Sequence, residues 1–452
     1  MSADSITARY LETFDRPVLP LPESPFARIR YAGQYLSRPV FLEAEELSSL
    51  ERDLSLVHSA LCSLPRRLYG GSLEDFARAV GMTEPQIACV LRGGGSRAGA
   101  VTAIARADLY KDATGFRLLE WNFGSTIGGA ENVDMCRALL GVPEMASFLA
   151  KEGMGHANSD EAMSTVLRSE TGYPAGTRPV VALVDTPGIF PRSEAILNAL
   201  AARWPDRGLS TRTGHLGELT RSDGRLELRG EPVDVVFRVF TIEDALAHLD
   251  DGLLEPLLSA VEDGEVAMFT PLDAELYGSK GALALLSDPA GQTGLTAEER
   301  DACARLLPWT RRVQPGEAVL RDGSRGNLLA HIRENQRELV LKPCFSYGGN
   351  GVTVGADPAV TPAMWQETLD QAADGSYVVQ ELIRAEPELF PSAAPGGLSA
   401  WRLVWGVFTT RGGYAGTVVR GVPAEAESAV VNAAQGAFFG CCFHSTADSG
   451  PA

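Results

Sequence analysis

The stretch RELVLKPCFSYGGNGVTVG, residues 337–355, contains the features from which the rest of the chain can be understood. Its apolar run predicts a short buried strand over residues 338–343. This strand brings Lys342 to the start of a loop that carries Gly348, Gly349 and Gly351. Glycines let backbone N–H groups close over phosphate oxygens, and a lysine ammonium supplies a mobile positive charge. The stretch therefore indicates polyphosphate binding, with a glycine-rich structural hairpin as the alternative.

Two widespread nucleotide-binding patterns do not describe this stretch. It has no G-x-x-x-x-G-K-[ST] loop, and its lysine precedes the glycines instead of following them. It also lacks the strand, G-x-G-x-x-G and helix order of a dinucleotide-binding fold. The neighbouring parts of the chain must therefore decide between the two interpretations.

Length and charge limit the class of protein. The chain has 452 residues, more than one hydrophobic core usually supports, so two or three substructures are expected. Its formal net charge of -18 argues against a protein that wraps duplex DNA or binds an anionic membrane, because phosphate contacts need a basic face. We therefore expect neither a nucleic-acid nor a membrane partner. A nucleotide remains possible, since it needs only a local basic pocket.

Cysteine usage and hydropathy suggest a reducing compartment. The seven cysteines are scattered and none belongs to a C-x-x-C pair, so neither a zinc site nor a disulfide framework is predicted. No apolar run reaches 18 residues, and residues 1–16 have no signal-peptide pattern. A cytoplasmic location is the expectation.

The order of predicted elements divides the chain into four parts. Residues 1–99 are mainly helical after a proline-rich lead, and residues 100–178 begin with two strands. Residues 179–278 alternate strand and helix and predict a small parallel α/β layer, preceded by a linker at 169–179. Residues 279–452 contain the lysine strand and a final hairpin, and small residues dominate after Val422.

Residues 72–92 have the outline of a helix-turn-helix, with a break at Gly81. The two helices are not basic and the whole chain is acidic, which favours a pair of packed helices. A DNA-binding regulator is the alternative interpretation of this segment.

Two strands, predicted over residues 101–110 and 115–123, carry four polar side chains. Residues two apart on a strand share a face, so Arg106 lies beside Asp108, and Glu120 beside Asn122. If the strands pair, three oxygen donors and a guanidinium converge, and such oxygens suit Mg²⁺. A structural ion pair between Arg106 and a carboxylate is the alternative.

Further polar residues follow the lysine strand. Gln380, Glu381 and Leu382 end a strand after two buried valines, where backbone groups of Glu381 and Leu382 could bond an adenine edge. Four cations stand in strands or at the start of a helix and invite anionic partners: Arg238, Lys280, Arg402 and Arg420.

Together these segments resemble the ATP-grasp superfamily, and in particular the circularly permuted ATP-grasp group typified by the synthetase domain of glutathionylspermidine synthase. The matching segments are "RAD" at 106–108, "LLEWN" at 118–122, "LYGSKGALALL" around Lys280, "LKPCFSYGGNGV" from Leu341 and "VVQEL" at 378–382. The metal motif precedes the phosphate loop in this chain, which is the order of the permuted group. The loop SYGGNG departs from that group's loop, which carries arginine and glutamate, and the first hundred residues match no known pattern.

The resemblance implies a mixed α/β protein with an ATP-grasp fold in circularly permuted order. It assigns residues 100–178 to the metal-binding part of the core and residues 279–452 to the nucleotide-binding part. Residues 179–278 would form the small α/β domain, and residues 1–99 an N-terminal helical segment. The oligomeric state is left open.

The resemblance also implies a reaction, the ATP-dependent joining of a carboxylate to an amine through an acylphosphate, with release of ADP and phosphate. The acid would be a small molecule or a peptide. An ATP-dependent phosphotransferase or a non-catalytic nucleotide-binding protein on the same fold is the alternative. The implied site residues are Asp108, Glu120 and Asn122 for Mg²⁺; Lys280, Lys342, Ser346, Gly348, Gly349, Gly351, Gln380, Glu381 and Leu382 for ATP; and Arg106, Arg402 and Arg420 for catalysis.

Overall fold

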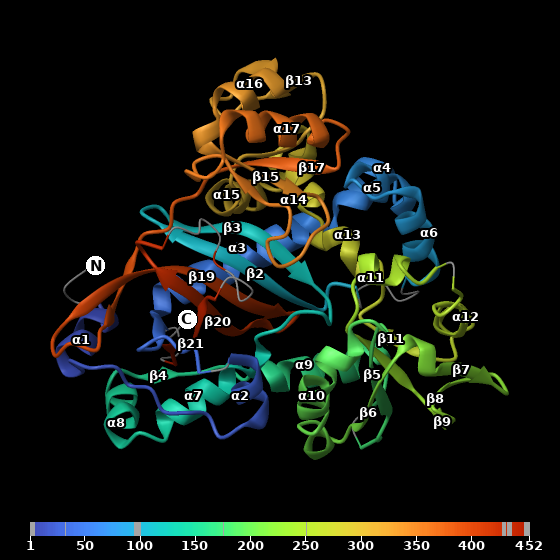
Figure 1. The fold of residues 1–452 in the computed structure, drawn as a ribbon, viewed down its shortest axis with the longest axis horizontal. Coiled ribbons are helices and arrows are strands. Elements are labelled where there is room, and N and C mark those ends of the chain that lie inside the picture. The colour runs from blue at the N-terminus through green and yellow to red at the C-terminus, as the bar shows by residue number, and fades with distance from the viewer. Residues whose placement is uncertain are drawn as a thin grey trace.

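The largest sheet of the protein has eight strands and forms the centre of the molecule (Figure 1). The computed structural model describes residues 5–31, 33–94, 101–174, 176–249, 251–426, 431 and 436–446. The strand order is β1-β21-β20-β19-β2-β3, with β18 paired to β19 and β4 paired to β21. These strands are β1 (Val40–Leu42), β2 (Ile104–Asp112), β3 (Gly115–Phe123), β4 (Met154–Gly155), β18 (Glu388–Pro391), β19 (Leu398–Thr410), β20 (Gly413–Pro423) and β21 (Phe438–Ser445).

The middle of this sheet confirms the predicted strand pairs. β2 and β3 are antiparallel neighbours, and the predicted final hairpin is β19 with β20. β19 pairs with β2, so the end of the chain lies directly beside its first third. Trp121 and Phe123 point into the core on one face, while Glu120 and Asn122 stand on the other.

Four strands of this sheet were not predicted from the sequence, namely β1, β4, β18 and β21. β1 lies parallel to β21, from opposite ends of the chain. β1 has only three residues, too few for an alternating pattern, and β21 follows a segment of small residues. The proline-rich lead also forms two short helices, α1 (Ile6–Thr13) and α2 (Pro25–Tyr31). The first hundred residues are thus mainly helical, as predicted, but they also extend the central sheet.

The predicted lysine strand lies in a second sheet, drawn above the first in Figure 1. Its order is β12-β17-β15-β16, so the lysine strand β15 lies between two neighbours. Leu339 and Leu341 are fully buried there against Trp365 of helix α17. The strands are β12 (Thr310–Arg312), β15 (Leu339–Pro343), β16 (Thr353–Val354) and β17 (Tyr377–Glu381), and the helices are α14 (Lys280–Ser287), α15 (Ala297–Leu306), α16 (Leu328–Glu334) and α17 (Pro362–Ala372).

The small parallel α/β layer is present as predicted, at the lower right in Figure 1. Its strand order is β11-β10-β5-β6, all parallel, and the structure adds β6, which the sequence analysis missed. The elements are β5 (Val180–Asp185), β6 (Ser210–His215), β10 (Val235–Arg238), β11 (Ala267–Phe269), α10 (Phe190–Ala201), α11 (Ile242–Leu246), α12 (Glu255–Glu262) and α13 (Ala274–Gly278). A small meander, β7 (Leu219–Ser222), β8 (Arg225–Leu228) and β9 (Glu231–Pro232), and the hairpin β13 (Glu317–Val319) with β14 (Arg325–Asn327) complete the strands of the described residues.

The expected linker at 169–179 begins inside a helix, because α9 (Ser159–Thr171) continues to Thr171. The helix ends at Gly172, whose φ of +79° is the left-handed conformation that closes many helices. The domain boundaries at 99, 178 and 278 stay predictions.

The helices of the first part pack against the rest of the molecule. α3 (Ala44–Cys62) buries Leu50, Leu54, Val57 and Leu61, the face that its three- and four-residue spacing predicts. Each such leucine contributes about 1.5–3 kcal/mol of hydrophobic stabilisation. The later helices of this part are α4 (Leu64–Tyr69), α5 (Leu73–Ala79) and α6 (Glu84–Arg92), and the second part adds α7 (Val133–Leu140) and α8 (Pro143–Lys151).

The segment that resembles a helix-turn-helix is the pair α5 and α6. α6 buries Ile87 and Val90, and its last residue, Arg92, forms ion pairs with Glu255 and Glu262 at 2.9 Å. This packing supports the prediction of two packed helices. Within the described residues, no helix combines the length and the apolar character that a bilayer crossing needs.

Candidate active site

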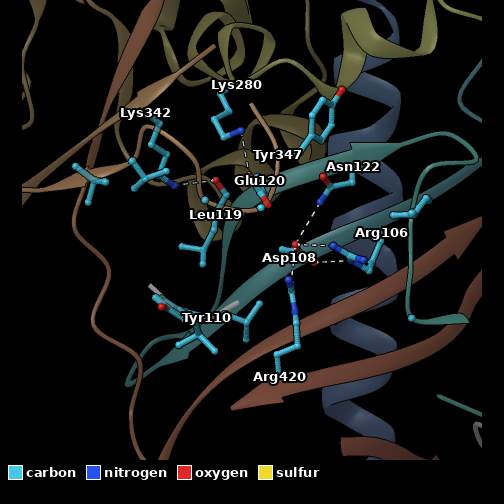
Figure 2. Close-up of a pocket in the computed structure, with 18 of the residues that line it drawn as sticks. Arg106, Asp108, Tyr110, Leu119, Glu120, Asn122, Lys280, Lys342, Tyr347 and Arg420 are labelled. Carbon is cyan, nitrogen blue, oxygen red and sulfur yellow. Dashed lines mark hydrogen bonds and ion pairs between the residues drawn. The ribbon is translucent and has the colours of Figure 1, made fainter. Parts of the chain in front are cut away.

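A cavity of about 370 Å³ lies between the eight-stranded sheet and the sheet that contains β15. Segments from the beginning, the middle and the end of the chain line it. Its charged and amide-bearing lining residues are Arg30, Arg106, Asp108, Glu120, Asn122, Lys280, Lys342, Gln380, Glu381 and Arg420. Figure 2 shows most of these side chains directed toward one another from the two sheets.

The pairing of β2 with β3 positions the polar side chains on the lower wall of the cavity, which the eight-stranded sheet forms. Arg106 lies opposite Asn122, and Asp108 lies opposite Glu120. The register then shifts, because Leu109 pairs with Leu118 and leaves one extra residue, Leu119, on β3. Such bulges bend a strand and redirect its groups. The Leu119 carbonyl accepts a hydrogen bond from Lys342 Nζ at 3.3 Å, which joins the two walls.

Asp108 is the centre of a buried charge network (Figure 2). Its carboxylate accepts two hydrogen bonds from Arg106, at 2.8 and 3.0 Å, and pairs with Arg420 Nη2 at 2.7 Å. Asn122 Nδ2 donates to the same carboxylate at 3.3 Å. Burial by itself would raise the pKa of Asp108, but Arg106 and Arg420 together hold this pKa well below its usual range. Asp108 therefore stays ionised in this network.

The ion pair that the sequence analysis gave as an alternative is thus present, and it bears on the predicted magnesium site. No group of three or more His, Cys, Asp and Glu side chains within the described residues could hold a metal ion by itself. Glu120 and Asn122, however, line the cavity and present oxygens of the kind that Mg²⁺ takes together with substrate phosphates. Asp108 could add an oxygen only beside its two arginines. The residues present therefore fit an ion that is held jointly with a nucleotide, and the metal roles stay predictions.

Two lysines enter the cavity from its upper wall, on the side of the sheet that contains β15. Lys342 Nζ donates to Gln380 Oε1 at 2.6 Å, and burial lowers the pKa of Lys342 to about 8, an effect that Glu120 opposes and Lys280 increases. Lys280, the first residue of α14, pairs with Glu120 Oε2 at 3.2 Å and donates to the Ser346 carbonyl at 2.9 Å. Both ammonium groups therefore lie next to the β2–β3 carboxylates.

The glycine loop closes one side of the cavity. Gly348 and Gly349 line it, with φ of +65° and +77°, a backbone conformation that favours glycine. Ser346 and Gly351 belong to the loop but not to the lining. A Cβ atom at Gly351 would lie 2.8 Å from the Pro343 ring, so the loop packs tightly onto the end of β15.

The expected adenine slot is only partly as predicted. Gln380, Glu381 and Leu382 line the cavity together with aliphatic side chains such as Val340. The backbone N–H of Glu381, however, donates to the Trp309 carbonyl at 2.9 Å, and that of Leu382 to the Glu338 carbonyl at 2.8 Å. Bonds within the protein thus remove both N–H groups as donors to a base, a detail of pairing that the strand pattern did not reveal.

The two predicted arginines of the final hairpin have different positions. Arg420 lines the cavity and pairs with Asp108. Arg402 is outside the lining, and its Nη2 donates to the Ala426 carbonyl at 2.8 Å. The structure therefore brings Arg106 and Arg420 together at Asp108, whereas Arg402 lies outside the cavity lining.

Two parts of the site were missed by the sequence analysis. Tyr347 lies in the quoted loop, lines the cavity and donates its hydroxyl to Glu275. An aromatic residue inside a glycine loop could have signalled it. Arg30 and the loop 126–129 form the far wall, and no sequence signal points to Arg30, because the lead that contains it has no periodicity.

Comparison with known proteins gives a result at the level of structure. No family model and no curated protein matches the sequence. Among 47 matching chains of solved structures is the apo form of a glutathione synthetase-like effector from Globodera pallida. The match has a TM-score of 0.51 and 15% sequence identity, and it covers 90% of this chain and 89% of that one. The likeness shows a mixed α/β fold and is consistent with the ATP-grasp type. The mixed α/β fold class that the resemblance implies is therefore confirmed.

Proposed function

We propose that the protein is an ATP-dependent carboxylate–amine ligase that forms an amide bond through an acylphosphate and releases ADP and phosphate. One observation carries the proposal. Among the residues that the structure describes, five cations, Arg30, Arg106, Lys280, Lys342 and Arg420, line a single cavity together with three carboxylates, in a chain whose net charge is -18. Such local reversal of charge attracts a polyanion. The name of the Globodera pallida neighbour, a glutathione synthetase-like effector, agrees with a ligase of this kind.

The two lysines are the proposed phosphate ligands. Lys280 and Lys342 lie on the same wall and contact the glycine loop and β17, respectively. Their ammonium groups would offset the charge of the α and β phosphates, and Gly348 and Gly349 would let backbone N–H groups approach the phosphate oxygens. The apolar end of the cavity, with Val340, would cover the base.

The β2–β3 side chains are the proposed centre of phosphoryl transfer. Glu120 and Asn122, with Asp108 beside them, would hold Mg²⁺, which in such sites neutralises charge on the phosphates during transfer. Arg106 and Arg420 are held by Asp108 with their guanidinium groups at the cavity. They would stabilise the transferred phosphoryl group and, later, the oxyanion of the tetrahedral intermediate.

Exclusion of water is the remaining requirement, since an acylphosphate hydrolyses readily. The glycine loop is fixed by Lys280 at Ser346 and by Tyr347 at Glu275. In this position it would shield the reacting carbon from solvent while the amine attacks. The proposal needs no side chain as a nucleophile.

Hydroxylamine provides a test that does not depend on the natural amine. The purified protein is incubated with ATP, Mg²⁺, hydroxylamine and single acids from a panel of small carboxylic acids and peptides. A ligase of this type gives a hydroxamate together with stoichiometric ADP and phosphate, and it does so only when an acid is present. A stable phosphorylated product instead would indicate the phosphotransferase, and nucleotide binding without any product would indicate the non-catalytic protein.

A further inference from the structure

The far end of the cavity has a cation that the proposed chemistry does not use. Arg30 belongs to α2, and its neighbour Tyr31 is buried with its ring 4.5 Å from that of Phe439 on β21. This contact fixes the end of α2 against β21 of the central sheet. Arg30 itself lines the cavity, and its side chain is 41% exposed.

The strand order shows how far Arg30 lies from the nucleotide end. Glu120 stands on β3, and Phe439 stands on β21, four strands away in the order β21-β20-β19-β2-β3. At about 4.8 Å between neighbouring strands, the cavity floor spans roughly 19 Å. Lys280 and Lys342 contact the β3 edge, whereas the contact of Tyr31, the neighbour of Arg30, with Phe439 lies at the opposite end.

The N–H donors of the Arg30 guanidinium have no close acceptor among the described residues. Its Nε lies 3.7 Å from Glu131 Oε1, which is too long for a hydrogen bond. Within the part of the chain that the structure describes, the Arg30 side chain makes no other ion pair and no hydrogen bond. Glu131 accepts a hydrogen bond from the Gly129 N–H at 2.9 Å through its other oxygen, Oε2, and its buried Oε1 has no hydrogen-bond partner among the described residues. A guanidinium with this many open donors at a cavity wall is suited to a planar anion.

Gly128 sets the spacing between Arg30 and the proposed reaction centre. Its carbonyl accepts a hydrogen bond from Arg106 Nη1 at 2.6 Å, and a Cβ atom on it would lie 3.0 Å from Arg30 Nη2. The two guanidinium groups therefore flank one residue. The adjoining lining is apolar and includes Ile127, Val418 and Phe439. A ligand here would have an apolar middle between two cationic ends.

We propose that the acid substrate is a dicarboxylate. Its reacting carboxylate lies next to Arg106 and Arg420, and its second carboxylate is bound by Arg30. This inference rests on the proposed function, because it needs an acid substrate in the cavity. It adds a specificity determinant, since Arg30 selects acids with two carboxylates over acids of the same length with one.

The test compares matched acids in the hydroxylamine assay. Glutarate and adipate are paired with their monoamides, glutaramate and adipamate, which differ only in the charge of one end. For the wild-type protein we expect kcat/KM to be about ten- to a hundredfold higher for the diacid than for its monoamide. This factor corresponds to the free energy of one hydrogen bond between charged groups. In Arg30→Met this preference should disappear while the KM for ATP stays the same. Arg28→Met, which removes an exposed arginine of the same helix, should retain it.

The other outcomes distinguish a failure of the Arg30 assignment from a failure of the ligase proposal. Equal use of acids and monoamides by the wild type, or a preference that survives in Arg30→Met, would overturn the assignment of Arg30. If no acid gives a hydroxamate, the ligase proposal fails, and calorimetric titration with glutarate and glutaramate decides the Arg30 site separately. Glutarate binding that is lost in Arg30→Met would support the anion site without the ligase, whereas the same binding in both proteins would overturn it.

Discussion

Two buried arginine–carboxylate pairs of this protein, Arg238 with Glu275 and Arg106 with Asp108, differ in what surrounds them. Arg238 of β10 and Glu275 of α13 are 2.7 Å apart, with side chains 0% and 2% exposed. Arg238 also donates to the backbone carbonyls of Phe240 at 2.6 Å and Thr270 at 3.0 Å. Arg106 and Asp108 are equally close, at 2.8 Å, but their network lines the cavity.

The comparison separates a structural ion pair from a candidate functional one. The sequence placed Arg238 among the cations that invite an anionic partner, and it gave Arg106 an ion pair with a carboxylate as its alternative role. Around Arg238 the protein supplies that anion and closes the site. Around Asp108 it supplies two guanidinium groups for one carboxylate, so positive charge is left for a ligand. Excess charge at a cavity, and not burial itself, indicates the functional site.

Removing the buried ion pair of Arg238 and Glu275, the closed pair, should have the largest effect, and this effect should be on the stability of the protein. Arg238→Met leaves Glu275 buried without its partner, which should lower the free energy of unfolding by about 3–5 kcal/mol. Chemical denaturation measures this loss. Hydroxamate formation by the folded protein at low temperature should stay close to wild type. A stable but inactive Arg238→Met protein would contradict the distinction.

Changing a side chain of the network that lines the cavity should lower turnover. Glu120→Gln keeps the shape but removes one carboxylate from the proposed Mg²⁺ site and the partner of Lys280. We expect turnover to fall about 10²- to 10³-fold with little change in the melting temperature. Mn²⁺ titration with ADP, followed by electron paramagnetic resonance, should show weaker metal binding. Glu367→Gln, on the exposed face of α17, is the charge-matched control and should behave as wild type.

The pH dependence of nucleotide binding sharpens the same comparison. Burial lowers the pKa of Lys342 to about 8 in the free protein, and bound phosphates would raise it again. Binding then takes up a proton above about pH 8, so the affinity for ADP should fall by up to about tenfold per pH unit there. Below pH 8 the lysine is charged in both states and the dependence should vanish. Calorimetry in buffers of different ionisation enthalpy measures the proton uptake, and Lys342→Arg, which keeps its charge, should show none.

The smallest effect is expected at the contact between the glycine loop and the buried pair of Arg238 and Glu275. Tyr347 of the glycine loop donates to Glu275, the carboxylate of the closed pair. Tyr347→Phe removes this bond and should lower the free energy of unfolding by about 1–2 kcal/mol. Because the loop is then held mainly by Lys280, the KM for ATP should also rise. An unchanged KM would mean that this contact does not position the loop.

Much of the architecture could be predicted because its signals are local. The alternation in GFRLLEWNF and the run in RELVLKP identify β3 and β15. Pairings over long sequence distances were not predictable. β1 and β21 have almost the whole chain between them, and β6 has a weak pattern.

The candidate site shows the same division. The two-residue period of a strand places Arg106 with Asp108 and Glu120 with Asn122, whatever the rest of the chain does. Their partners came from elsewhere, since Arg420 reaches Asp108 from β20 and Lys280 reaches Glu120 from α14. The bulge that turns the Leu119 carbonyl to Lys342 also had no sequence signal.

The sequence by itself thus determined which side chains share a strand face and which loop can approach a phosphate, because both follow from backbone geometry within a few residues. Only the tertiary structure decided which charges are neutralised and which remain open to a cavity. That outcome depends on distances between residues hundreds of positions apart, and on whether other elements cover them, as they cover Arg238 and leave Arg30 and Arg420 at the cavity wall.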